Sequence, residues 1–169
     1  MIKHAMMRGL FAAVLVFGGK AQAEEKEPWA LLEVGGVGEL GFPDSTSSLG
    51  PAIGIDVTAV RNWLEIEAGV TSLFGNGRTE WSTDLIFKKP YTLSKTMEIE
   101  LGVGPAWMRE TRGGKITDSI GGEAVLEMQF WPWPERKLGW FLEPSYGYDF
   151  TRGHEQALGV TVGLLIPIP

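Results

Sequence analysis

From about residue 29 onward, apolar residues alternate with acidic or small residues at a period of two. In residues 62–70, NWLEIEAGV, two glutamates alternate with apolar side chains, and the same order returns at 97–104, MEIELGVG. A period of two places successive side chains on opposite faces of a β-strand. Clusters of Gly, Pro, Asn and Asp interrupt the alternation at fairly even spacing, which is typical of turns between strands. The pattern therefore predicts an all-β chain.

Eight alternating segments are predicted, and most are near the roughly 9–11 residues that a tilted strand needs to cross a membrane. An even number lets neighbouring strands run antiparallel around a closed ring. The joints RN and PWPERK indicate short turns at one end, whereas GFPDSTSSLG, ETRGGKITDSIGG and FTRGHEQ indicate longer loops at the other. The predicted segments are Trp29–Leu40, Pro51–Val60, Trp63–Phe74, Thr79–Phe87, Met97–Met108, Glu123–Trp131, Leu138–Asp149 and Ala157–Ile166.

Two kinds of barrel share this alternation. In an eight-stranded transmembrane up-and-down β-barrel, the large apolar side chains meet lipid and the polar ones line the lumen; in a soluble lipocalin-like barrel, the apolar side chains fill a ligand cavity. The membrane arrangement predicts lipid-facing positions at Leu64, Ile66, Leu101, Val103, Leu142, Val160 and Val162. It predicts lumen-lining carboxylates at Glu65, Glu67, Asp84, Glu98, Glu100, Glu127 and Glu143.

Side-chain size favours the membrane barrel, whereas charge favours the soluble one. Eight strands leave an interior that side chains just fill, and glycines on the polar face relieve crowding there. Lys88 is the only base placed on that face against roughly a dozen carboxylates, and burying unpaired like charges is costly. An aromatic girdle at the two membrane interfaces is predicted from residues near strand ends: Trp29, Trp63, Phe74, Trp107, Trp131, Trp133 and Phe150.

The N-terminus indicates export. Residues 1–23 combine a basic start, an apolar run and the small-residue ending AQA, which together predict a cleaved signal peptide followed by a single barrel domain at 24–169. Loss of three bases with this segment changes the formal charge from −6 to −9. Clustered cations for a nucleic acid are therefore lacking. The chain has no cysteine, which excludes thiol nucleophiles and Cys-ligated metals.

Candidate catalytic and metal-binding groups are few. His154 is the single histidine of the predicted mature chain, and the residue two positions later is Gln156, so the His and Ser spacing known in lipid A deacylases is not matched. Ser145 and Glu143 on the preceding segment offer only a weak alternative. The same-face pairs Glu65/Glu67 and Glu98/Glu100 have oxygen ligands suited to Ca²⁺ or Mg²⁺, but strand periodicity alone produces such pairs. We therefore expect no catalytic residue, metal or cofactor.

Several segments resemble those of small outer-membrane barrels. LEIEAGVTSLFG, LGVGPAWM, FLEPSYGYDF and ALGVTVGLLIPIP, together with the signal peptide, make residues 29–169 similar to the OmpA-like, OmpX-like and OmpW-like proteins of Gram-negative bacteria. The resemblance implies an outer-membrane location, contact with the lipid bilayer and lipopolysaccharide, and insertion by the outer-membrane assembly machinery. It supplies no catalytic residues. The chain ends LIPIP and lacks the terminal aromatic residue common in this group.

The expected function is that of a non-enzymatic outer-membrane barrel. Its role would be structural support of the envelope, surface interaction, or minor passage of small solutes with a preference for cations because of the acidic lining. Two alternatives stay open at this point. One is a soluble periplasmic lipocalin-like barrel that binds an apolar ligand, and the other is a barrel enzyme that modifies lipid A or phospholipid.

Overall fold

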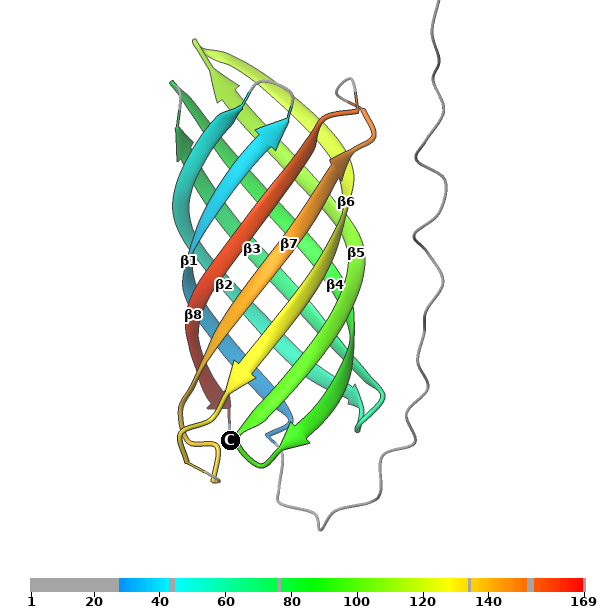
Figure 1. Cartoon of the computed structure of the whole chain (residues 1–169). Helices are drawn as coiled ribbons and strands as arrows, with labels where there is room; N and C mark the ends of the chain where they lie inside the picture. The colour runs from blue at the N-terminus through cyan, green and yellow to red at the C-terminus, as the bar shows by residue number, and fades with distance from the viewer. Residues whose placement is uncertain (1–27, 43–44, 76, 134, 152–153, 169) are drawn as a thin grey trace, which may run out of the picture.

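Eight β-strands pair antiparallel in chain order, and the last pairs with the first to close a barrel (Figure 1). The computed structural model describes residues 28–42, 45–75, 77–133, 135–151 and 154–168. The predicted signal peptide lies outside the described residues. Among the described residues, no helix is long and apolar enough to cross a membrane. The strands are β1 Ala30–Phe42, β2 Thr46–Val60, β3 Leu64–Gly75, β4 Arg78–Ser94, β5 Met97–Arg112, β6 Lys115–Phe130, β7 Gly139–Asp149 and β8 Gln156–Ile168.

The barrel has two distinct ends. The hairpins β1–β2, β3–β4, β5–β6 and β7–β8 turn at the upper end of Figure 1, and the C-terminus lies at the lower end. The closed eight-stranded fold confirms the predicted class. A 16-residue strand such as β5, tilted by about 40°, rises roughly 40 Å, which exceeds the ~25 Å apolar band of a membrane barrel.

The prediction of longer loops at one end is wrong for two of its three joints; the third, FTRGHEQ, contains the connection between the end of β7 at Asp149 and the start of β8 at Gln156. The segment ETRGGKITDSIGG continues β5 and β6 up to a two-residue turn at Gly113 and Gly114, whose φ angles of 57° and 79° suit a tight hairpin turn. Likewise, β1 and β2 are separated only by residues 43–45, and β4 continues to Ser94. Apolar alternation marks only the part of a strand that has one apolar face. It therefore does not distinguish polar strand ends from loops.

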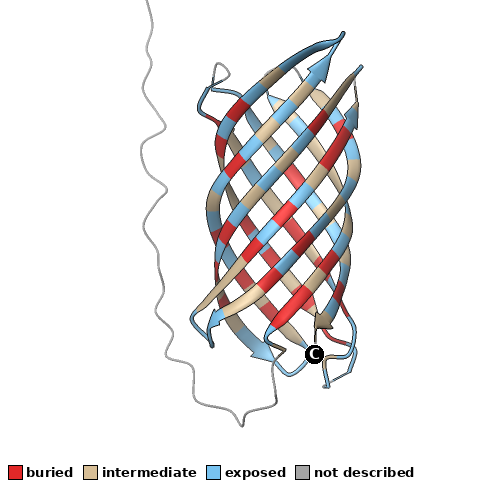
Figure 2. Ribbon diagram, turned by 180° about the vertical axis from the view of Figure 1, so that it is seen from behind, coloured by how far each residue is buried: buried red, intermediate tan, exposed pale blue. Residues whose placement is uncertain are grey.

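Burial alternates along the strands (Figure 2). Among the described residues, 31 large hydrophobic side chains are exposed, whereas nine hydrophobic residues are buried. The buried side chains instead include a large set of carboxylates and a lysine. The barrel is therefore apolar on its outer wall and polar inside, the reverse of a soluble core.

Candidate functional site

The structure puts the acidic face inside the barrel and the apolar face on its outer wall. Among the carboxylates considered above, Glu67, Glu98, Glu100, Glu127 and Glu143 are buried, while Glu65 and Asp84 are half-buried and line interior cavities. On the outer wall, four of the apolar positions are strongly exposed, and Leu64, Ile66 and Leu142 are partly exposed. The exposed four are Leu101, Val103, Val160 and Val162. The lipocalin-like arrangement, with these residues filling a cavity, is not the one in the structure.

Lys88 lies at the centre of the acidic interior. Its side chain is fully buried on β4, and six carboxylates have an oxygen within 4.0 Å of its Nζ atom. The distances are 2.7 Å to Glu67, 3.5 Å to Asp56 and 3.7 Å to Glu33, Glu100 and Glu143, and Nζ also donates a hydrogen bond to Glu127. Lys88 and these six residues, here termed the Lys88 cluster, come from every strand except β8.

Small neighbours make room for the Lys88 cluster. Gly102 on β5 pairs with Lys88, and a Cβ atom at this glycine would lie 2.9 Å from Lys88 Cγ and 2.6 Å from Ile86 Cγ2. The glycine therefore leaves space for the aliphatic part of Lys88. On the next strand, Gln129 Nε2 donates a 2.7 Å hydrogen bond to Glu100 Oε1, which holds that carboxylate in place.

Alternation places Lys88 on the polar face as its only base, and it places Glu33 and Asp56 on the same face, although these two are not among the predicted lumen-lining carboxylates. Alternation does not, however, show which inward residues of different strands lie at the same height. That depends on the strand register, which brings Asp56 opposite Glu67 and Glu100 opposite Glu127.

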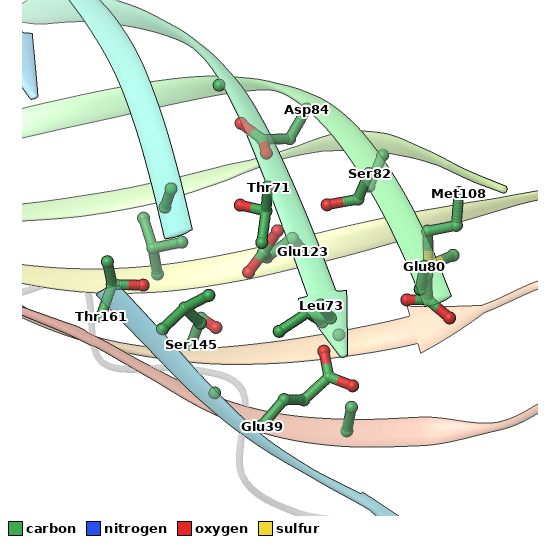
Figure 3. A pocket seen from close by; sticks show the side chains of 18 of the residues that line it. Glu39, Thr71, Leu73, Glu80, Ser82, Asp84, Met108, Glu123, Ser145 and Thr161 are labelled. Atoms are coloured by element: carbon green, nitrogen blue, oxygen red, sulfur yellow. The ribbon is translucent and has the colours of Figure 1, made fainter. Parts of the chain in front are cut away.

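Above the Lys88 cluster lies a polar cavity of about 220 Å³, here termed the upper cavity. Arg78 reaches into it from the first residue of β4, with Nη2 3.7 Å from Glu39 Oε1 and Nη1 3.4 Å from Glu110 Oε2. Figure 3 shows the carboxylates and hydroxyls that face this space. Its lining includes Glu39, Thr71, Leu73, Glu80, Ser82, Asp84, Met108, Glu123, Ser145 and Thr161.

Below the Lys88 cluster the interior is closed by apolar packing. Trp131 is 1% exposed and packs with Leu31, Phe141 and Leu165. Its predicted place in an interfacial girdle is wrong, because Trp131 continues the alternation of β6 in which Glu127 and Gln129 face the interior. Its backbone N donates a 2.8 Å hydrogen bond to Thr96 O. The other residues of the predicted girdle are exposed, namely Trp29, Trp63, Phe74, Trp107, Trp133 and Phe150.

A second, much smaller cavity of about 10 Å³, here termed the lower cavity, separates the Lys88 cluster from this lower end. Arg136 lines this cavity. Its Nη1 lies 2.8 Å from Glu98 Oε2, and its guanidinium lies 5.4 Å from the Trp131 ring. The cavity is lined by Pro28, Leu31, Asp56, Thr58, Glu65, Glu98, Glu100, Gln129 and Arg136.

The interior carboxylates also approach one another closely enough to share a cation. Three sets of three have oxygens within 4.8 Å of each other. Two of these sets are Glu33/Asp56/Glu127 and Glu67/Glu127/Glu143, and the third is Asp56/Glu65/Glu100. Carboxylate oxygens are ligands for hard cations such as Ca²⁺ and Mg²⁺.

The single mature histidine lies away from this interior. The His154 ring is 5.7 Å from the Tyr148 ring at the upper end, and its residue adopts a positive φ of 63° in the β7–β8 connection. Ser145, the weak nucleophile candidate, lines the upper cavity.

Comparison with known proteins supports the fold. No protein-family model matches the chain, and no curated protein sequence does. Solved structures do match. Neisserial surface protein A is 12% identical with a TM-score of 0.70, covering 82% of this chain and 97% of that one. The N-terminal β-barrel domain of Pseudomonas aeruginosa OprF is 13% identical with a TM-score of 0.59, covering 83% and 100%.

A third structural match is the outer membrane enzyme PagL, at 14% identity and a TM-score of 0.52, covering 81% of this chain and 99% of that one. At these identities the likeness concerns the fold. The resemblance to small eight-stranded outer-membrane barrels inferred from the sequence is confirmed at that level.

Proposed function

We propose that this protein is a non-enzymatic outer-membrane β-barrel with a closed interior, which supports the envelope and offers its upper end for surface interactions. The observation that carries the proposal is the apolar outer wall. Soluble monomers rarely expose contiguous apolar patches beyond a few hundred Å², whereas here apolar side chains are exposed on all eight strands. Lipid is the solvent that such a surface requires.

The distribution of residues along the outer wall agrees with a membrane layer. Aromatic side chains exposed toward the upper end include Phe74, Trp81 and Trp107, and beyond them Arg109 and Asp118 form an exposed ion pair with Nε 2.8 Å from Oδ1. Aromatic side chains sit at membrane interfaces and charged pairs belong in water. The upper parts of β5 and β6 therefore project beyond the lipid.

A closed interior favours a structural or surface role over solute passage. In the described residues, the upper and lower cavities are separate, and the buried Lys88 cluster lies between them. Below, Trp131 and its apolar neighbours fill the barrel. A hydrated ion crossing the barrel would have to break both layers, so the proposal includes no steady conductance.

The absence of enzymatic activity is also part of the proposal. PagL is described as an enzyme, so the fold itself permits catalysis. In this chain, however, Gln156 stands two residues after His154 where a serine would be needed, and Tyr148 is the aromatic neighbour of the histidine. These residues do not support a hydrolase.

Cell fractionation tests the location. The full chain, expressed in a Gram-negative host, is expected in the outer-membrane fraction, and its unheated form should migrate differently from its heated form on a denaturing gel. Recovery of the mature protein from the periplasm without detergent would contradict the proposal. Planar-bilayer recordings test the closed interior: refolded protein should give no steady current, and single-channel steps selective for cations would favour passage instead.

A further inference from the structure

We propose that the lower cavity binds one Ca²⁺ ion through the carboxylates of Asp56, Glu65 and Glu100. These residues come from β2, β3 and β5, and their carboxylate oxygens lie within 4.8 Å of one another. The site is internal to the barrel, so this inference does not rest on the membrane location proposed above.

Negative charge exceeds positive charge in the barrel interior around Lys88. Lys88 brings one positive charge to a point where six carboxylates lie within 4.0 Å. Ionised carboxylates buried without a counter-charge are strongly destabilising. Arg78 and Arg136 are occupied at the two ends, with Glu39 and Glu110 above and Glu98 below. A further positive charge within the cluster, whether a metal ion or shared protons, is needed to balance it.

The Asp56/Glu65/Glu100 set differs from the other two sets of carboxylates in its distance from Lys88. Every member of the Glu33/Asp56/Glu127 and Glu67/Glu127/Glu143 sets lies within 4.0 Å of Lys88 Nζ, so an amine already occupies their centre. In the proposed set Asp56 and Glu100 also lie within this distance of Lys88 Nζ, but the third carboxylate does not. Glu65 is different. Within the described residues it has no basic partner, and the Thr58 hydroxyl, 3.5 Å from its Oε1, is its hydrogen-bond donor.

Asp56 is a buried carboxylate with few partners. Asp56 is 1% exposed, and no side-chain donor among the described residues hydrogen-bonds to its Oδ1. Its Oδ2 lies 3.5 Å from Lys88 Nζ, a distance of ion pairing at best. The Asp56 side chain also lines the lower cavity with Glu65 and Glu100. Since buried polar groups nearly always have a partner, this carboxylate points to a ligand in the cavity.

The chemistry of the cavity identifies the ion. A space of about 10 Å³ holds a single ion or water molecule and excludes any organic ligand. The three carboxylates and the Thr58 hydroxyl on its wall offer oxygen ligands, and Arg136, the cation on the same wall, is paired with Glu98 at 2.8 Å. Ca²⁺ accepts six to eight oxygens in flexible geometry, whereas Mg²⁺ demands a near-ideal octahedron and keeps several waters, for which this cavity has no room.

Calorimetric titration of the refolded mature chain in detergent, after treatment with a chelator, tests the site. CaCl₂ and MgCl₂ are added in separate titrations to the parent and to two variants. Asp56→Asn removes a ligand, whereas Asp84→Asn removes an interior carboxylate that lines only the upper cavity. We expect one Ca²⁺ per parent chain, binding weakened at least about tenfold in Asp56→Asn, and unchanged binding in Asp84→Asn. Ca²⁺ should raise the thermal midpoint of the parent and of Asp84→Asn.

Three results would overturn the inference. The absence of saturable Ca²⁺ binding would mean that protons balance the charge. An equal loss in Asp84→Asn would mean diffuse binding by an acidic interior, and tighter binding of Mg²⁺ would refute the choice of ion. If Asp56→Asn does not refold, Glu65→Gln serves instead, because Glu65 is only half-buried and makes no pair with Lys88; its Ca²⁺ affinity must fall by a similar factor.

Discussion

Replacing Lys88 with methionine removes the positive charge from the middle of the acidic interior while keeping most of the side-chain volume. Lys88 Nζ has carboxylate oxygens at 2.7 Å and 3.5 Å, a hydrogen bond to Glu127, and three further carboxylates at 3.7 Å. At an effective dielectric constant of about 20, one unit pair at ~3.5 Å is worth about 5 kcal/mol. Repulsion among the carboxylates and the desolvation of the amine offset most of the summed attraction between Lys88 and the six carboxylates.

The net cost of breaking such a buried arrangement by removing one partner is about 3–5 kcal/mol. That is a large fraction of the roughly 5–15 kcal/mol that stabilises a folded domain. The destabilisation should also depend on pH. Without the amine, the folded variant binds more protons than the unfolded chain, so its stability rises as the pH falls, and the penalty shrinks toward pH ~4.

Urea unfolding of protein refolded in lipid vesicles, followed by tryptophan fluorescence in the presence of a chelator, measures this cost. The neighbouring Lys89→Met is the matched control. Lys89 Nζ donates to Asn62 O at 2.6 Å in an exposed position, so its loss should cost no more than about 1 kcal/mol. If Lys88→Met is no less stable than Lys89→Met at neutral pH, or if its penalty does not shrink in acid, the structural role assigned to Lys88 is wrong.

Three further changes test the two faces and one turn by the same unfolding assay. Val160→Arg, on the outer wall, should cost about 2–4 kcal/mol in vesicles, and an unchanged free energy of unfolding would argue against lipid contact there. Gly102→Ala should lower the free energy of unfolding by about 1–3 kcal/mol through crowding, because the new Cβ would lie 2.6 Å from Ile86 Cγ2. Gly147→Ala, whose Cβ would have nothing within 4 Å, should change it little, and equal effects of the two changes would contradict this packing. Gly114→Val at φ 79° should cost about 1–3 kcal/mol from backbone strain, and a neutral result would mean that the hairpin turn adapts.

Strand positions could be predicted from the sequence because two-residue alternation records which side of a strand is apolar. The predicted strands are too short where the contrast between an apolar and a polar face ends. Along the upper parts of β5 and β6, Thr111, Thr117 and Asp118 face surroundings that do not demand apolar residues, so these ladder positions resembled a loop around Gly113 and Gly114.

The convergence of six carboxylates on Lys88 could not be predicted from alternation. Glu33 and Glu143 are far apart in the sequence, and only the register of paired strands brings both within 4.0 Å of one amine. Trp131, in contrast, could have been placed by alternation. A position at a strand end is typical of an interfacial tryptophan, but Trp131 has the inward parity of Glu127 and Gln129, and its ring lies inside the barrel beside Arg136.

Because the chain has no cysteine, single introduced cysteines can carry spin labels that test which face of the barrel contacts lipid. Val160→Cys and Thr161→Cys place single spin labels on successive residues of β8, the first on the exposed wall and the second in the upper cavity. In vesicles, relaxation of the label at residue 160 should respond to oxygen dissolved in the lipid and hardly to a water-soluble nickel chelate. The label at residue 161 should show the opposite preference. A label at 160 that responds mainly to the chelate, with one at 161 shielded from it, would contradict a barrel with its apolar face toward lipid and its carboxylates inside.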